Sequence, residues 1–186
     1  MNATRKPLFL IQSRYNQWMN HKLYTVCEQV PDEERKRDMG AFFRSIHGTL
    51  NHLLLGDRLW MGRFTGTEFP VESLDQELYG EFDALWQART DTDEAICAWI
   101  DSLEETDLDR IIAFKAVVTQ RTHRFRLVDA LLHFFHHQTH HRGQVTTLLS
   151  QLGLDFGTTD MMWMPGIEIT ADGDSTSYTM PVGTVP

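Results

Sequence analysis

The chain contains little cysteine. Only two of its 186 residues are cysteines, Cys27 and Cys97, and they lie far apart within apolar segments. Buried free thiols are common in such surroundings, and neither residue has an evident activating neighbour, so we expect both to be structural. A chain of this length can bury an adequate core without disulfides or a structural metal. Any metal that it binds is therefore expected to serve its function.

Positive charge and long apolar runs are also scarce. Lys and Arg number 17 against 26 Asp and Glu, which gives a formal net charge of -9. A surface for duplex nucleic acid needs clustered cations to neutralise phosphates, so nucleic acid is not an expected partner. No apolar run reaches membrane-spanning length, and the run from Leu8 to Ile11 is too short for a signal peptide. We expect no membrane partner and a reducing, cytoplasmic setting.

Four long helices are predicted by apolar residues that recur at steps of three and four. They cover about residues 7–29, 31–66, 73–104 and 127–152, with an interruption of the third expected near residues 90–93. Pro31 is expected to end the first helix and open the second, and Gly153 to end the last. Long helices of this kind predict a helical bundle.

The remaining segments do not follow a helical pattern. Residues 109–127 are rich in β-branched residues and alternate polar with apolar positions, which predicts a hairpin or extended crossover. Residues 171–186 are rich in Gly, Ser, Thr and Asp and are expected to be poorly ordered. The fold class is therefore all-α: a four-helix bundle over residues 1–160, with a short crossover before the last helix and an irregular C-terminal tail over residues 161–186.

Five of the nine histidines lie in one short run, residues 133–141. On a helix, His137 and His141 lie one turn apart on the same face, where neutral imidazoles can bind zinc, nickel, copper or iron. Both continue the apolar stripe marked by Phe134 and Val145, so they need partners inside the core. A metal would supply one. Hydrogen-bonded core histidines, or a polar face at a dimer interface, are the alternatives.

A third ligand is best sought on the second predicted helix. His47 and His52 are five residues apart and therefore face about 140° apart on that helix. Only one of them can look into the bundle beside the pair. Apolar periodicity alone does not choose between them.

Two motifs resemble the DinB family of damage-inducible, metal-dependent bundle proteins. The first comprises residues 45–53 with Asp57 and Trp60, and the second residues 129–133 with residues 137–144. The likeness covers about residues 7–160. It implies that His52, His137 and His141 are the metal ligands, and that His133 matches a family histidine outside the ligand set.

One departure from the family pattern precedes the first ligand of the pair. His136 occupies a position where the family often has Asn, so it is a candidate second-shell group or extra ligand. Asp57 and Arg142 are further second-shell candidates, although charged groups on helices are usually solvated. Trp60 is expected in the core rather than at a pocket wall.

The resemblance implies a divalent metal ion, with zinc or nickel expected, in a site that keeps a coordination place open. Open sites of this kind suit catalysis. Relatives of the fold resemble S-transferases and isomerases that use a low-molecular-weight thiol. A non-catalytic metal-binding stress protein and a metallohydrolase are the alternatives, and no catalytic side chain is assigned. We also expect a homodimer, formed through His136, His140 and the apolar residues 161–164.

Overall fold

The computed structural model describes residues 4–168, and the chain divides into two compact units, residues 1–156 and 157–186. The helices of the first unit are α1 (Lys6–Glu28), α2 (Asp32–Lys36), α3 (Ile46–Thr65), α4 (Phe82–Ser102), η1 (Glu105–Asp109) and α5 (Leu127–Gln151). Its strands are β1 (Ile111–Lys115) and β2 (Thr122–Arg126). The second unit contains the short helix η2 (Met161–Trp163). The disorder expected over residues 171–186 lies outside the described residues.

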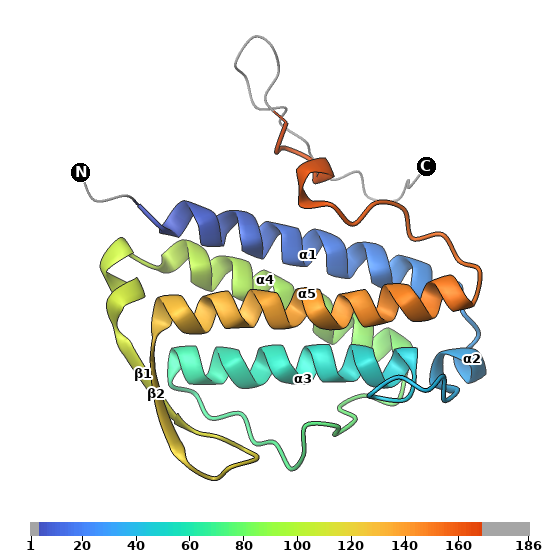
Figure 1. The fold of residues 1–186 in the computed structure, drawn as a ribbon, viewed down its shortest axis with the longest axis horizontal. Coiled ribbons are helices and arrows are strands. Elements are labelled where there is room, and N and C mark those ends of the chain that lie inside the picture. Colours follow the sequence, from blue (N-terminus) through green and yellow to red (C-terminus); the bar gives the residue numbers. More distant parts are fainter. Residues whose placement is uncertain (1–3, 169–186) are drawn as a thin grey trace. The chain divides into compact units, whose positions relative to one another are not determined.

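The four long helices form the predicted bundle. They lie side by side, with the hairpin at one end and α2 at the other (Figure 1). In the ring of neighbours α1 packs on α4 and α5, and α3 packs on the same two helices. Within residues 4–168 no helix is both long and apolar enough to cross a membrane.

The prediction of a continuous second helix is confirmed at its start, where Pro31 precedes α2, but is wrong over residues 37–45. After α2 the chain leaves the helix at Arg37 and forms a loop over residues 38–45, where Phe42 is 83% exposed rather than in the core. Gly40 and Arg44 both have positive φ in this loop, which a continuous helix does not allow. The Ser45 hydroxyl then accepts a hydrogen bond from the Gly48 N–H at 3.0 Å and starts α3.

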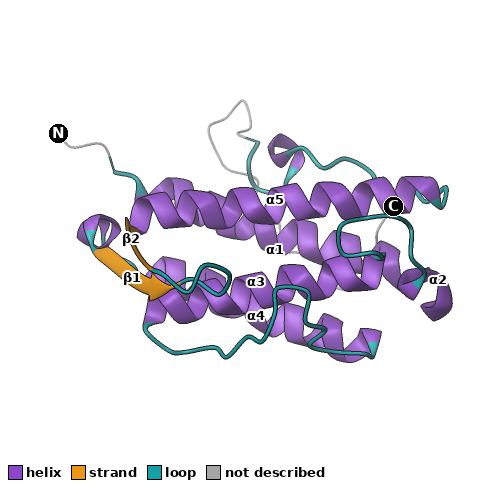
Figure 2. Cartoon of the chain, turned by 60° about the horizontal axis from the view of Figure 1, so that its bottom comes forward, coloured by secondary structure: helices purple, strands orange, loops and turns teal. Residues whose placement is uncertain are grey.

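The prediction for the third helix is wrong in two respects: where the helix starts, and the interruption expected near residue 90. Residues 66–81 form a long loop that runs along the outside of the bundle (Figure 2), and α4 begins only at Phe82. Leu74 and Leu78 have helical spacing, but Gly66 ends α3 with a φ of 77° and Pro70 follows within the loop. The expected interruption near residues 90–93 is absent, because α4 is continuous from residue 82 to residue 102.

The predicted crossover and final helix are confirmed. β1 and β2 pair antiparallel, from Ile111 opposite Arg126 to Lys115 opposite Thr122. α5 follows directly, because the Leu127 N–H donates to the Arg110 carbonyl at 2.8 Å. Gly153, with a φ of 73°, lies just after the Leu152 cap and ends the helix as expected.

Buried polar side chains occupy the middle of the bundle. One apolar cluster, which includes Leu23 and Leu149, lies toward α2, and another, which includes Ile100 and Leu131, lies toward the hairpin. Between them each long helix contributes buried polar residues: Asn16 and Asn20 from α1, His52 and Asp57 from α3, Arg89 and Asp93 from α4, and Gln138, His141 and Arg142 from α5. This polar layer contains the candidate site.

Candidate metal site

Three histidines from two helices converge at one point. The Nε2 atom of His52 on α3 lies 3.3 Å from Nε2 of His137 and 3.2 Å from Nε2 of His141, both on α5. The two α5 nitrogens are 3.2 Å apart. Three nitrogens bound tetrahedrally to a zinc ion at about 2.1 Å would be separated by about 3.4 Å. The spacing of this histidine trio therefore fits a single small divalent ion.

Hydrogen bonds on the outer side of the rings define which nitrogens carry protons. Nδ1 of His52 lies 2.8 Å from the Leu74 carbonyl oxygen, and Nδ1 of His141 lies 2.8 Å from Oε1 of Gln144. Both oxygens only accept, so both Nδ1 atoms donate and both Nε2 atoms keep a bare lone pair. This is the arrangement that metal-binding imidazoles adopt, because the outer partner sets the tautomer and the ring orientation.

Burial keeps the trio neutral at physiological pH. Desolvation lowers the pKa of His52 to about 4. Desolvation and the nearby His141 lower the pKa of His137 to about 3. The pKa of His141 is also lowered by desolvation, against the effect of the hydrogen bond that its ring donates to Gln144. Neutral imidazoles are the form that binds a cation, and three of them turn their Nε2 atoms toward one point.

Two neighbours set the positions of the rings. Phe43, from the loop before α3, stacks on His52 with ring centroids 3.8 Å apart. Opposite the pair on α5, Gly56 leaves room for His137: a Cβ atom at residue 56 would lie 3.1 Å from Cε1 of that ring. The close approach of α3 and α5 at the trio therefore depends on the missing side chain at Gly56.

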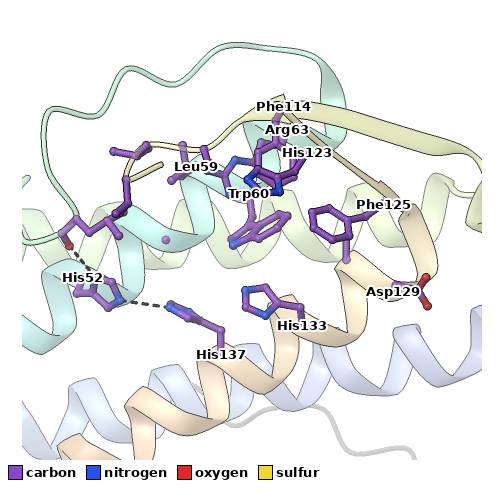
Figure 3. A pocket seen from close by; sticks show the side chains of 16 residues that line it. His52, Leu59, Trp60, Arg63, Phe114, His123, Phe125, Asp129, His133 and His137 are labelled. Carbon is purple, nitrogen blue, oxygen red and sulfur yellow. Dashed lines mark hydrogen bonds between the residues drawn. The ribbon is translucent and has the colours of Figure 1, made fainter. Parts of the chain in front are cut away.

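A cavity of about 630 Å³ borders His52 and His137. It lies between α3, α5 and the hairpin, and Figure 3 shows His133, Trp60 and Phe125 along its walls. Most of the walls are apolar, with Arg63 and Asp129 as the charged lining residues. Its size is that of a pocket for a small organic molecule. The trio can therefore be reached by a ligand from one side.

Other sequence candidates fall into two groups. His47 turns away from the trio, and its Nε2 lies 2.9 Å from the Tyr79 carbonyl oxygen, so only His52 joins the pair. His133 lines the cavity, 5.9 Å from the His137 ring between centroids. His136 and His140 are exposed on α5. The expectation that Trp60 lies in the core is wrong, because it is half-buried and forms a cavity wall.

Asp57 and Arg142 are buried, contrary to the expectation that they are solvated. Oδ2 of Asp57 lies 2.6 Å from Nη1 of Arg89, and Gln138 donates to the other oxygen. Arg142 donates to Asn16 on α1. Burial raises the pKa of Asp57 to about 7, against the opposing effect of Arg89. Asp57 and Arg142 make these contacts within a buried network, whereas the Leu74 carbonyl and Gln144 accept hydrogen bonds from the outer nitrogens of the trio.

The network extends across the bundle to Asp93. Arg89 donates to Asp93 at 2.8 and 3.1 Å, and Asn16 and Asn20 donate to the same carboxylate at 3.0 to 3.2 Å. Asp57, Arg89, Asp93 and Arg142 together provide two carboxyl and two guanidinium groups. The carboxyl groups of this ionic network therefore have partners within the protein.

Neither cysteine is suited to be a nucleophile. Burial raises the pKa of the Cys27 thiol to about 12, and burial also raises the pKa of Cys97. Neither residue lines the cavity. This fits the structural role expected from the sequence.

Comparison with known proteins supports the resemblance found in the two motifs. The model of the DinB family matches residues 2–173. The chain belongs to the DinB family. Protein DinB of Bacillus subtilis (strain 168) is 26% identical to it over an alignment of 161 residues, and the match covers 78% of this chain and 87% of that protein.

A solved structure shares the fold. The crystal structure of a DinB-like protein from Bacillus cereus superposes with a TM-score of 0.62 at 22% identity. The match covers 85% of this chain and 99% of that chain. At this level of identity the likeness establishes a common DinB fold and nothing further about the site.

Several residues around the site have no local signal in the sequence. Leu74 contributes through its carbonyl, which any residue could supply, and Phe43 lies in a segment with a helical apolar pattern. Arg63 resembles an ordinary surface cation of an amphipathic helix. Gln144 could have been suggested from the sequence, because it follows His141 by three residues and so lies on the same face of α5.

Proposed function

We propose that this DinB family protein binds one divalent ion, zinc or nickel, through His52, His137 and His141. The observation that carries the proposal is the convergence of the three Nε2 atoms. Two of the rings have their only proton fixed on the outer side, so two bare lone pairs face each other at 3.2 Å. A cation between them turns this repulsion into attraction.

We further propose that the protein is a metal-dependent enzyme that transfers a low-molecular-weight thiol to an electrophile. Among residues 4–168 the cavity lining includes no Ser, Thr, Cys or Lys, which favours a nucleophile that enters as a ligand. When bound, the ion would supply Lewis acidity that lowers the pKa of an entering thiol. The sulfur then forms a bond to the electrophilic carbon, and the thiol proton leaves with the displaced group or is passed to the adduct.

The shape of the site supports small-molecule chemistry. His52 and His137 form one end of the cavity, and mainly apolar walls extend from them toward the hairpin (Figure 3). Such walls accommodate the apolar body of an electrophile and keep water away from a reactive thiolate. A metallohydrolase is the second candidate, because the same trio could equally activate water.

Metal content tests the first proposal. Protein prepared without an affinity tag is expected to contain about one divalent ion per chain by elemental analysis. The double variant His137→Ala/His141→Ala should lose it, whereas His21→Ala, which removes an exposed histidine from α1, should keep it. Full metal content in the double variant would refute the assignment.

Activity tests the second proposal. Wild type and His52→Ala would be assayed with several small thiols and a haloaromatic acceptor, and separately with ester and amide substrates. Removal of His52 changes the coordination geometry while the pair on α5 remains, so thiol conjugation should be lost even where some metal is kept. Hydrolysis lost in the same way would favour the hydrolase. Wild-type activity no higher than the metal-free background in both panels would leave a metal-binding stress protein.

A further inference from the structure

Arg63 is the one charged residue lining the cavity that has no ionic partner among residues 4–168. The other charged lining residue, Asp129, is paired with Arg126 at 2.9 and 3.0 Å. Arg63 instead stacks against two rings, with its guanidinium carbon 4.5 Å from the centroid of Trp60 and 4.0 Å from that of Phe114. In Figure 3 its side chain lies with Phe114 at the hairpin side of the cavity.

The cation stays charged although it is partly removed from water. Burial lowers the pKa of Arg63 to about 10, so the group is still protonated at neutral pH. Within the part of the chain that the structure describes, the N–H donors of this guanidinium have no protein acceptor. The guanidinium lies over two rings that are nearly perpendicular to each other, with an interplanar angle of 77°. The planar group itself presents its donors as a fork that matches a carboxylate.

We propose that Arg63 binds the carboxylate of a small organic acid whose apolar body fills the cavity. The acceptor for the proposed transferase would then be an aromatic or unsaturated carboxylic acid. Trp60, Phe114, Phe125 and the valines 117 and 118 surround the body of such an acid, and Arg63 neutralises its charge. The identification of this acid as the acceptor rests on the proposed function, whereas its binding to Arg63 does not.

The distance between the two ends of the cavity limits the size of the ligand. His52 and Arg63 are eleven residues apart on α3, so their Cα atoms are separated by about 16 Å along the helix. Both side chains reach the same cavity. A carboxylate held by Arg63 therefore leaves room for at least one ring between the carboxylate and the trio. Acetate-sized anions would fill only a small part of the 630 Å³.

Binding measurements with a matched pair of probes test the charge preference. Isothermal titration calorimetry would compare 4-phenylbutyrate with its neutral amide, 4-phenylbutyramide, on the full-length protein as purified and again after chelation. The acid is expected to bind about tenfold more tightly than the amide in both samples, because the charge-assisted pair with Arg63 is lost in the amide. Equal affinities, or no binding of either probe at millimolar concentration, would overturn the proposal.

Variants of the arginine locate the interaction. Arg63→Gln should remove the preference for the acid, and Arg63→Lys should keep part of it through the remaining charge. Arg124→Gln removes a cation from the exposed face of β2 outside the cavity and should change neither affinity. Thermal melts confirm that each variant is folded. An unchanged preference in Arg63→Gln would show that another group binds the carboxylate.

The carboxylate bound by Arg63 could belong to the acceptor acid or to the thiol. A hydrophilic thiol acid distinguishes these two cases. Mercaptosuccinate carries carboxylates without an apolar body, and its affinity is expected to depend little on Arg63. If Arg63 affects the binding of mercaptosuccinate but not that of phenylbutyrate, Arg63 binds the carboxylate of the thiol compound. The proposal for an apolar acid is then wrong. The binding proposal and the metal assignment can fail separately. If chelated protein prefers phenylbutyrate and the preference depends on Arg63, the binding proposal holds even when elemental analysis finds no metal.

Discussion

Two groups of polar side chains lie in the middle of the same bundle. One consists of oppositely charged residues and the other of neutral histidines. The ionic network of Asp57, Arg89, Asp93 and Arg142 joins oppositely charged groups from α3, α4 and α5, and Asn16 and Asn20 of α1 hydrogen-bond to it. The histidine trio instead brings three neutral ring nitrogens to within 3.3 Å of one another, and those of His52 and His141 both carry bare lone pairs. The first group has oppositely charged partners within the protein, whereas the second has none among its own members and could hold a cation.

The two groups also differ in whether a ligand in the cavity can reach them. Asp57 is 0% exposed and Arg89 is 1% exposed, and neither lines the cavity. His52 and His137 form part of the cavity wall. The comparison teaches that burial of polar groups does not identify a functional site by itself. What separates the two groups is whether complementary partners are already present in the protein and whether a ligand can enter.

Loss of the central cation of the network should have the largest effect. Arg89→Met leaves two buried carboxylates without the cation that lies between them, and should destabilise the protein by roughly 3–5 kcal/mol in urea unfolding. Arg37→Met, which breaks the exposed pair with Glu34, should cost less than about 1 kcal/mol. Similar losses for both variants would contradict the view that the network holds the four helices together.

Metal removal should have a moderate effect on stability and leave the fold intact. If the trio binds an ion only in the folded state, at a free concentration one hundred times the dissociation constant, stripping it removes about 2.7 kcal/mol. Thermal melts should shift downward while the helical circular dichroism persists at low temperature, because the network and both apolar clusters remain. Chelation should not shift the melt of His137→Ala/His141→Ala. A random-coil spectrum after chelation would show that the site is structural.

Acid should destabilise the metal-free protein through the trio. The folded-state pKa values of His52 and His137 are about 4 and about 3, whereas an unfolded histidine titrates near about 6.5. Their contribution to stability is therefore fully present above pH 6.5 and is lost as the pH falls through the folded-state values. Unfolding free energies between pH 7.5 and 4.5 should fall less steeply in His52→Asn. Equal slopes would mean that carboxylates or other histidines dominate the acid response.

The smallest effect is expected from a methyl group at the close approach of the two helices. In Gly56→Ala the new Cβ would lie 3.1 Å from the His137 ring, so the ring must shift and the metal affinity should fall several-fold. The free energy of unfolding should change little. The gain in helix propensity from glycine to alanine, up to about 1 kcal/mol, offsets the cost of shifting the ring. Gly143→Ala is the matched control on α5, where nothing lies within 4 Å of an added Cβ, and it should leave metal affinity unchanged.

The sequence predicted helices well where apolar periodicity and packing agree. α1, the hairpin and α5 lie within one or two residues of their predicted ranges. The second and third helices were predicted too long toward their N-termini, because Phe42, Leu74 and Leu78 have helical spacing within loops. Those loops are not incidental to the site. Phe43 stacks on His52 and the Leu74 carbonyl orients it, so the regions that periodicity misread supply the surroundings of one ring.

The sequence by itself determined the pair His137 and His141, because a spacing of four residues on one helix is local geometry. Two family motifs in the sequence indicated His52 as the third member. Only the tertiary structure decided that His52 rather than His47 meets the pair, since this depends on how α3 is rotated against a helix 85 residues away. The same packing decided that Asp57 and Arg142 are buried with Arg89, and that Arg63 faces a cavity closed by the hairpin. The partner of a charged side chain on one helix often lies on another helix, so the pairing depends on how the helices pack.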